Sequence, residues 1–222
     1  MRFISDVPAG IAFFVVAACW VGFGAILVVG KRGASKTQTR QDAKSHLGFV
    51  VQGVAYAICL CFPRTQFSPF APASKMAEEA LGALAGAIAI ASVWFCFAAA
   101  RALGKQWALV ARVVEGHELI TEGTYAIVRN QIYLAMFGML VATGLAVSRW
   151  QALAGAFILF FVGTEIRIRS EERLLRDAFG AKFGEYARRV PGLFPRVFCS
   201  GWCRTYGAHA NFQCLPRASA LG

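Results

Sequence analysis

Two polar stretches of the sequence hold side chains that could carry chemistry. The first, EGHELITEGTYAIVRNQIY, covers residues 115–133, and the second, EIRIRSEERLLRDAFGAKFGEYARRVPGLFP, covers residues 165–195. In the first, Arg129 and Asn130 directly precede a long apolar run, and asparagine is a favoured N-cap residue. A helix that starts there presents unpaired N–H groups and a positive dipole end beside the Arg129 charge, so a carboxylate or a phosphate could bind.

Tyr125 and Tyr133 flank these polar residues. Their aromatic faces could hold a cation or an adenine ring, because the ring face carries partial negative charge and stacks on flat groups. Tyrosine is also a common anchor at the membrane–water interface, so both interpretations stay open.

The second stretch begins with a dense group of charges. Its members are Arg167, Arg169, Glu171, Glu172, Arg173 and Arg176. On a helix, Arg167 and Glu171 share one face and could form a salt bridge worth only tenths of a kcal/mol. The alternative is that charges so close to a bilayer are costly enough to be retained for a substrate or an ion.

Beyond these charges, apolar residues recur at helical intervals. They are Leu175, Phe179, Phe183 and then Tyr186 or Ala187. Such spacing predicts a helix that docks on the membrane-embedded part of the protein, rather than a cofactor site.

Apolar segments must position all of these groups. With 57% hydrophobic residues, 16% charged residues and a mean hydropathy of +0.53, the chain is more apolar than an ordinary soluble domain, whose charged share is about 25%. Five uncharged runs approach the roughly 20 residues that a spanning helix needs. They cover residues 11–30, 47–62, 80–100, 130–148 and 150–164. The sequence therefore predicts an all-α, polytopic helical membrane protein with about five transmembrane helices, the second and the fifth being short.

Positive charges set the expected orientation. Most of the 23 Lys and Arg residues share one side of the membrane if the N-terminus faces outward. The positive-inside rule then predicts an outer N-terminus and a cytosolic C-terminus. The net charge of +11 comes without an RNA- or DNA-binding signature, so we expect contacts with anionic membrane lipids and none with nucleic acid. The oligomeric state stays open.

Cysteines and glycine motifs suggest neither a metal site nor a soluble nucleotide-binding fold. Four cysteines lie in the apolar runs, where a thiol packs as a small hydrophobe: Cys19, Cys59, Cys61 and Cys96. A loose cluster near the end lacks the usual zinc spacing and consists of Cys199, Cys203, His209 and Cys214. We therefore predict no metal site. No GxGxxG follows a strand, and GxxxxGK[ST] does not occur.

A tight turn at residues 147–150 separates the last two apolar runs. A hairpin of two spans returns the chain to the membrane face from which it started, so the two polar stretches should meet on the cytosolic side. The chain then divides into a three-span region (1–104), a functional region with a hairpin and a cytosolic helix (105–198), and an irregular tail (199–222).

Five motifs in these stretches resemble, in order and spacing, the isoprenylcysteine carboxyl methyltransferase family and its broader relatives, which include phospholipid methyltransferases. The family shows His-x-Leu-Val-Thr-x-Gly-x-Tyr, Arg-His-Pro-x-Tyr, a hairpin of spans, Arg-x-x-x-Glu with a second Glu, Phe-Gly-x-x-Tyr and Arg-x-x-Pro. Here these read HELITEGTY, RNQIY, RIRSEE, FGAKFGEY and RRVP. The resemblance covers about residues 105–197.

The resemblance implies that these segments surround S-adenosylmethionine. It places the following residues beside the cofactor: His117, Glu118, Leu119, Ile120, Tyr125, Asn130, Gln131, Ile132, Tyr133, Glu171 and Glu172. It makes Arg167 the arginine that faces the acceptor, and Arg167, Glu171 and Arg129 are the residues expected to act in catalysis.

Two positions depart from the family pattern. Asn130 replaces the histidine and Gln131 replaces the proline. A role that needs an imidazole proton is thereby lost, whereas an amide still donates and accepts hydrogen bonds and can cap a helix.

Three functions remain. Carboxyl O-methylation of an isoprenylcysteine-like, prenylated or other lipid-like acceptor comes first, because Arg167 suits an anionic acceptor. Methylation of a phospholipid or another amine comes second, with Glu171 or Glu172 as the group that accepts the proton. A catalytically silent membrane scaffold or transport accessory is third, because two motif residues differ.

Overall fold

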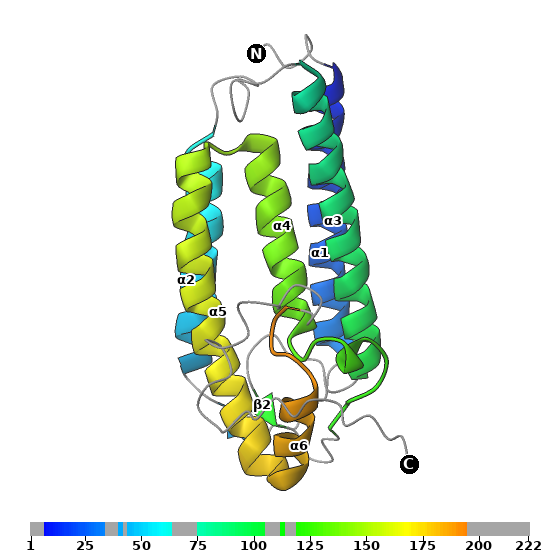
Figure 1. The fold of residues 1–222 in the computed structure, drawn as a ribbon, viewed down its shortest axis with the longest axis vertical. Helices are drawn as coiled ribbons and strands as arrows, with labels where there is room; N and C mark the ends of the chain where they lie inside the picture. Colours follow the sequence, from blue (N-terminus) through cyan, green and yellow to red (C-terminus); the bar gives the residue numbers. More distant parts are fainter. Residues whose placement is uncertain are drawn as a thin grey trace, which may run out of the picture.

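The computed structural model describes residues 7–33, 40–41, 44–63, 75–104, 112–113 and 119–194. Within these ranges the fold is helical. In chain order the elements are α1 (Val7–Gly33), β1 (Arg40–Gln41), α2 (Lys44–Cys61), α3 (Lys75–Leu103), β2 (Arg112–Val113), the 3-10 helix η2 (Gly123–Ala126), α4 (Gln131–Val147), α5 (Trp150–Phe179) and α6 (Ala181–Arg189). Five long helices run alongside one another, and α6 lies at one end of the bundle (Figure 1).

Each of the five long helices corresponds to one apolar run of the sequence, to within one residue where a run is longer than its helix. Three of them, at residues 10–30, 79–103 and 150–179, are long and apolar enough to cross a membrane, and two, at 45–61 and 131–147, are shorter apolar helices. The fifth uncharged run is short, and the helix that contains it is extended by flanking residues. Helix α5 continues for 30 residues through the charged second stretch, because Glu, Arg and Leu are good helix formers there.

Helix α4 lies between two pairs of helices. On one side it packs with α1 and α3 around a core that includes Phe23, Ala89 and Met139. On the other side it meets α2 and α5 around Leu140 and Phe160. The hairpin of α4 and α5 is therefore fixed from both sides. Figure 1 shows α4 between these two groups.

A close crossing of α2 and α5 depends on two glycines. A Cβ atom added at Gly48 would lie 2.6 Å from the carbonyl oxygen of Gly163, and a Cβ at Gly163 would lie 2.8 Å from the carbonyl oxygen of Gly48. Without side chains at these positions the two backbones approach each other directly, as is common for helix pairs in membranes.

The expected docking helix is present but interrupted. Gly180 has φ = 54°, a left-handed conformation that glycine adopts at low cost, and it separates α5 from α6. Phe183, Tyr186 and Val190 of this end of the chain form a small core, against which Leu119 and Phe179 also pack. The apolar periodicity thus marks a docked segment that bends at Gly180 instead of one straight helix.

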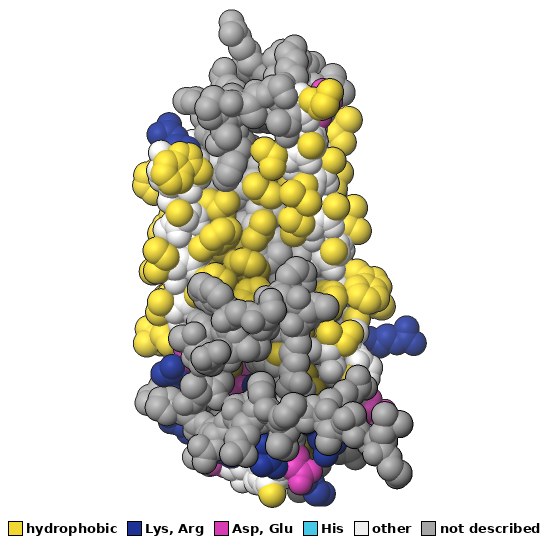
Figure 2. Space-filling model, in the orientation of Figure 1, with side chains coloured by type: hydrophobic (Ala, Val, Ile, Leu, Met, Phe, Trp, Pro, Cys, Tyr) yellow, Lys and Arg dark blue, Asp and Glu magenta, His cyan; other side chains and the backbone are white. Residues whose placement is uncertain are grey.

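The surface separates apolar from charged side chains. Large hydrophobic residues on the outside of the long helices are strongly exposed, among them Phe14, Val21 and Ile158. Figure 2 shows these side chains covering the long helices, with most acidic and basic groups of the visible face gathered toward the end that holds α6. This distribution fits helices whose outer faces contact lipid.

Some sequence-based expectations lie outside the described residues. They are the irregular tail at 199–222, with its cysteines and histidine, and the residues 105–111 and 114–118 that open the expected functional region. The division into regions at 104 and 198 stays a prediction. Within the described residues, no group of three or more His, Cys, Asp or Glu side chains is arranged to hold a metal ion.

Candidate active site

The turn between α4 and α5 brings the two polar stretches together. Helix α4 ends at Val147 and α5 begins at Trp150, so only two residues connect the antiparallel helices. The turn is held by a backbone hydrogen bond of 3.2 Å from the Arg149 nitrogen to the oxygen of Phe62, at the end of α2. As a result the start of α4 lies beside the charged half of α5, as the sequence predicts.

Tyr133 of α4 and Glu171 of α5 form the first contact between the stretches. The Tyr133 hydroxyl donates a hydrogen bond of 2.8 Å to Oε2 of Glu171. The guanidinium carbon of Arg167 lies 4.7 Å from the centre of the Tyr133 ring, within the range of a cation–π contact. Tyr133 and Arg167 are both buried, at 5% and 3% exposure, so water only weakly screens the positive charge of Arg167.

A second helix holds Arg167 from the opposite side. Its Nη1 donates a hydrogen bond of 2.7 Å to Oε1 of Gln52 in α2, and Nε2 of Gln52 donates one of 2.7 Å to the Thr164 hydroxyl. The Phe49 ring centre lies 5.5 Å from the Arg167 guanidinium carbon. Arg167 is therefore fixed between two aromatic rings and a neutral amide.

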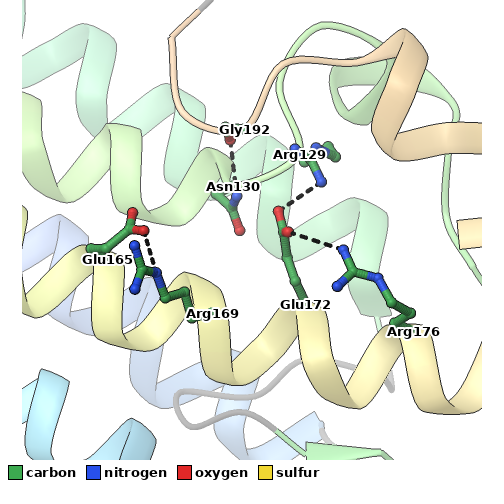
Figure 3. A network of polar contacts seen from close by, with 7 residues as sticks. All are labelled: Arg129, Asn130, Glu165, Arg169, Glu172, Arg176 and Gly192. Atoms are coloured by element: carbon green, nitrogen blue, oxygen red, sulfur yellow. Dashed lines mark hydrogen bonds and ion pairs between the residues drawn. The ribbon is translucent and has the colours of Figure 1, made fainter. Parts of the chain in front are cut away.

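Glu172 anchors the loop before α4. Its Oε1 lies 2.6 Å from Nη1 of Arg129, and its Oε2 lies 3.9 Å from Nη2 of Arg176 (Figure 3). The side chains of Arg129 and Glu172 are only 15% and 22% exposed, whereas Arg176 is 63% exposed. The first ion pair is thus the stronger one, since it is both shorter and better shielded from water.

The segment after α6 closes over the start of α4. The backbone nitrogens of Arg129 and Asn130 each donate a 3.0 Å hydrogen bond, to the carbonyl oxygens of Pro191 and Gly192 respectively. Asn130 adds a hydrogen bond of 2.9 Å from Nδ2 to the same Gly192 oxygen (Figure 3). We call residues 191–192, which accept these hydrogen bonds, the strap.

Asn130 occupies the N-cap position of α4, as expected, but its side chain forms no capping hydrogen bond. The side chain instead donates a hydrogen bond to the Gly192 carbonyl oxygen of the strap. An amide hydrogen can reach a carbonyl oxygen 62 positions away in the sequence, and a pattern of local residues cannot reveal that partner.

Tyr125 connects the 3-10 helix to α6. Its carbonyl oxygen accepts a hydrogen bond of 2.8 Å from the Tyr186 hydroxyl. Burial, and next the Glu171 carboxylate, raise the pKa of Tyr125 well above its usual value. Burial also raises the pKa of Tyr186 to about 12, although Arg129 opposes this effect. Both tyrosines are therefore neutral at physiological pH.

The other expected cofactor residues are distributed around this centre. Leu119 packs against the α6 core, and Ile120 is partly buried. Ile132 packs against the core of α1, α3 and α4. Gln131 is fully buried and its Nε2 lies 3.4 Å from the carbonyl oxygen of Val128. His117 and Glu118 lie outside the described residues.

The chemistry of the site fits a cationic, nucleoside-like cofactor. Glu171 and Glu172 supply carboxylates, and Tyr125 and Tyr133 supply aromatic faces. Among the described residues, Oε1 of Gln131 and the Ser170 hydroxyl are buried without a hydrogen-bond partner. A buried polar atom without a partner is costly, so further polar groups are expected at these atoms.

Sequence reasoning missed Gln52 and the strap. Gln52 is the only amide side chain in the second apolar run, and a polar residue within a span is itself a signal of function. The RRVP motif pointed to Pro191, but only the fold shows that the backbone of this segment accepts hydrogen bonds from Arg129 and Asn130.

Parts of the chain are similar to known proteins. Residues 81–182 match the family described as phospholipid methyltransferase. A cobalt-zinc-cadmium resistance protein of Cupriavidus metallidurans is 37% identical over 118 residues, which cover 50% of this chain and 52% of that protein. A nickel-cobalt-cadmium resistance protein of Alcaligenes xylosoxydans xylosoxydans is 34% identical over 116 residues, with 50% and 53% covered.

A plant enzyme is similar to a shorter part of the chain. Protein-S-isoprenylcysteine O-methyltransferase B of Arabidopsis thaliana is 37% identical over 84 residues, which cover 37% of this chain and 42% of the enzyme. The chain spans about half the length, or less, of the curated relatives it matches. The chain thus matches the phospholipid methyltransferase family over residues 81–182 and is distantly similar to an isoprenylcysteine O-methyltransferase, which confirms the resemblance seen in its motifs.

Proposed function

We propose that this chain is an integral membrane methyltransferase that transfers a methyl group from S-adenosylmethionine to the carboxylate of a lipidic acceptor, an isoprenylcysteine or a similar molecule. The observation that carries the proposal is the position of Arg167. This buried cation contacts Tyr133, which bonds the Glu171 carboxylate, and it also contacts Phe49 and Gln52, two residues that line an apolar groove among the helices. An acceptor with an anionic head group and an apolar chain would place the head group near Arg167 and the chain in the groove.

The groove supports the lipidic part of the acceptor. It has a volume of about 580 Å³ and is lined by α1, α2 and α4, almost entirely with apolar side chains. Phe49 and Gln52, which both contact Arg167, also line it. A chain lying in the groove would therefore bring its head group close to Arg167 without leaving apolar surroundings.

The two stretches support the cofactor part. Glu171 and Glu172 carry negative charge at the end of the bundle where the loop before α4 and α6 come together. A sulfonium cation is attracted to such carboxylates, and the tyrosine rings offer stacking surfaces. We assign His117, Glu118, Leu119, Ile120, Asn130, Gln131 and Ile132 to the same cofactor site on the family resemblance.

The reaction needs alignment more than acid or base chemistry. S-adenosylmethionine would supply an electrophilic methyl group on a positively charged sulfur. Transfer of that methyl group to a carboxylate would form a C–O bond as the C–S bond breaks, with the electron pair kept by sulfur, so the site would need no general acid or base. Arg167 orients the carboxylate for this attack, for which the reacting atoms must lie about 3 to 3.5 Å apart. The departure from histidine at Asn130 is compatible with such a reaction.

The proposed topology has five spans with an outer N-terminus and a cytosolic C-terminus. Alternation of the five long helices puts the N-terminal end of α1 and the α4–α5 turn on one side, and α6 on the other (Figure 1). The basic residues of α5 and α6 then face the cytosol, as the positive-inside rule requires. A water-soluble cofactor reaches the site from that side.

Two other functions have specific support. The phospholipid methyltransferase family favours an amine acceptor, for which Glu171 or Glu172 would take up the proton. The two relatives are named as metal-resistance proteins, which keeps the third alternative, a catalytically silent membrane scaffold or transport accessory, among the candidates. Each predicts a different product, or none.

One assay separates these functions. Membranes that contain the protein are incubated with S-adenosylmethionine labelled in the methyl group, and the lipid-soluble label is treated with base. Base-labile methyl esters support carboxyl methylation, and base-stable lipid amines support the amine function. No label together with no cofactor binding would favour the accessory. Arg167→Gln should abolish ester formation, whereas Arg173→Gln, which removes an exposed arginine of the same helix, should not.

A further inference from the structure

We propose that Gln52 of α2 is a positioning residue that orients the Arg167 guanidinium toward the carboxylate of the acceptor. The inference rests on the proposed function and adds to it a helix outside the family match at residues 81–182. Gln52 is 1% exposed, and both of its side-chain polar atoms are engaged at 2.7 Å.

The hydrogen bonds fix the direction of the amide. Arginine has only donors, so the oxygen of Gln52 must face Arg167 and its NH₂ group must face Thr164. Thr164 lies one turn before Arg167 on α5, so Gln52 joins two successive turns of that helix. An apolar residue of the same size would leave the buried guanidinium short of an acceptor.

The close crossing of α2 and α5 makes this contact possible. A Cβ atom at Gly48 would lie 2.5 Å from Cγ of Arg167, and one at Gly163 would lie 2.9 Å from Cγ of Gln52. The two glycines therefore leave the space that the Arg167 and Gln52 side chains occupy. The close approach of α2 and α5 thus lies next to the hydrogen bond between Gln52 and Arg167.

The neutrality of Gln52 gives the contact its functional meaning. A glutamate would accept the same hydrogen bond, but its charge would cancel that of Arg167. An amide holds the guanidinium in place without adding a negative charge beside it. Because Gln52 also lines the groove, the cation is presented where the head group of an acceptor in the groove would arrive.

Binding of a defined probe tests the inference. The probe is an N-acetylated, S-farnesylated cysteine with a free carboxylate, and its methyl ester serves as the uncharged reference. Purified full-length wild-type protein is compared with Gln52→Glu, which cancels the charge, and with Gln52→Met, which removes the hydrogen bonds but keeps the volume. Cys59→Ala is the matched control, because Cys59 is fully buried, lies two turns further along α2 and does not line the groove.

We expect both Gln52 variants to weaken binding of the carboxylate probe by about tenfold or more, as for a lost hydrogen bond to a charged group. Binding of the ester and of S-adenosylmethionine should change less than about twofold, and Cys59→Ala should bind all ligands as wild type does. Equal weakening of probe and ester would show that Gln52 acts only on packing and would overturn the inference. Unchanged probe binding in both variants would also overturn it.

Methyl transfer is measured on the same preparations, so that the two hypotheses can fail separately. If wild-type protein binds the probe with the expected dependence on Gln52 but produces no ester, the proposed function fails and the positioning role stands. If ester forms at equal KM for the probe in wild type and both variants, the positioning role fails and the function stands. A wild-type protein that does not bind the carboxylate probe overturns both.

Discussion

The Tyr133 hydroxyl of α4 donates a hydrogen bond to the Glu171 carboxylate of α5 across the hairpin, at 2.8 Å. Arg167 lies against the face of the same tyrosine ring, so one side chain contacts both a carboxylate and a guanidinium. Tyr133 thus joins two oppositely charged side chains of α5 at the start of α4.

Removing this hydrogen bond should weaken the cofactor site. Tyr133→Phe keeps the ring but removes the donor, and Glu171→Gln removes the charge. Each should lower affinity for S-adenosylmethionine by about tenfold, since a hydrogen bond to a charged group contributes about 1.5 to 3 kcal/mol. Titration calorimetry measures the change. Glu185→Gln, at an exposed position of α6, is the control; a similar loss in that variant would remove the proposed cofactor site.

The ion pair between Arg129 and Glu172 should stabilise the folded protein. Arg129→Gln leaves a poorly exposed carboxylate with only the distant Arg176, so we expect a loss of about 1 to 3 kcal/mol, discounted for the partial exposure of the pair. Thermal unfolding in detergent checks this value. A double-mutant cycle with Glu172→Gln should show coupling between the two positions; additive effects would contradict a direct ion pair.

The strap should loosen when Asn130 loses its donor. Asn130→Asp places a carboxylate oxygen near the Gly192 carbonyl oxygen, so attraction becomes repulsion. Amide hydrogen exchange at residues 190–194 should become faster, while exchange in the middle of α3 stays unchanged. Asn130→His, which restores the family residue, keeps a donor and should protect this segment better than the aspartate. Equal exchange in the two variants would argue against the side-chain contact.

The crossing of α2 and α5 should not tolerate a methyl group at Gly163. Its Cβ would lie 2.8 Å from a backbone oxygen and 2.9 Å from Cγ of Gln52, so Gly163→Ala should destabilise the protein by about 1 to 3 kcal/mol. Gly155→Ala on the same helix meets nothing within 4 Å and should be neutral or stabilising by up to about 1 kcal/mol. Thermal unfolding of the two variants should shift in opposite directions, and equal shifts would contradict the close approach.

The contact of α6 with the 3-10 helix should weaken at alkaline pH. The pKa of Tyr186 is raised from 10.0 to about 12, so the folded protein holds this proton more tightly than the unfolded chain does. The associated stability is complete below pH 10 and is lost as pH rises toward about 12. The unfolding midpoint of the wild type should therefore fall more steeply in that window than the midpoint of Tyr186→Phe. Parallel curves would show that Tyr186 does not contribute.

Much of the fold could be predicted from apolar runs, because each run coincides with one helix or exceeds it by a single residue at an end. The end of α5 was missed since a search for uncharged residues stops at Glu165, although the helix continues and pairs Glu165 with Arg169 at 2.5 Å. A search for membrane spans depends on hydropathy, whereas a helix needs only favourable backbone and side-chain conformations.

The meeting of the two polar stretches could also be predicted, because a short turn between antiparallel helices leaves few alternatives. The individual partners could not. Asn130 reads as a helix cap, and only the fold shows that its amide reaches Gly192. Gln52 reads as an isolated polar residue until α2 is placed against α5. Contacts between residues distant in sequence depend on packing, which a single sequence does not specify.

The strap has a consequence for biosynthesis. The carbonyl groups that accept hydrogen bonds from the backbone of Arg129 and Asn130 belong to Pro191 and Gly192, which are translated after the whole α4–α5 hairpin. In the proposed five-span topology, a nascent chain can complete that hairpin before these acceptors have left the ribosome. Insertion of the hairpin and closure of the strap are therefore separate events. A message cut short after α5 would yield a hairpin whose backbone nitrogens at Arg129 and Asn130 lack these partners.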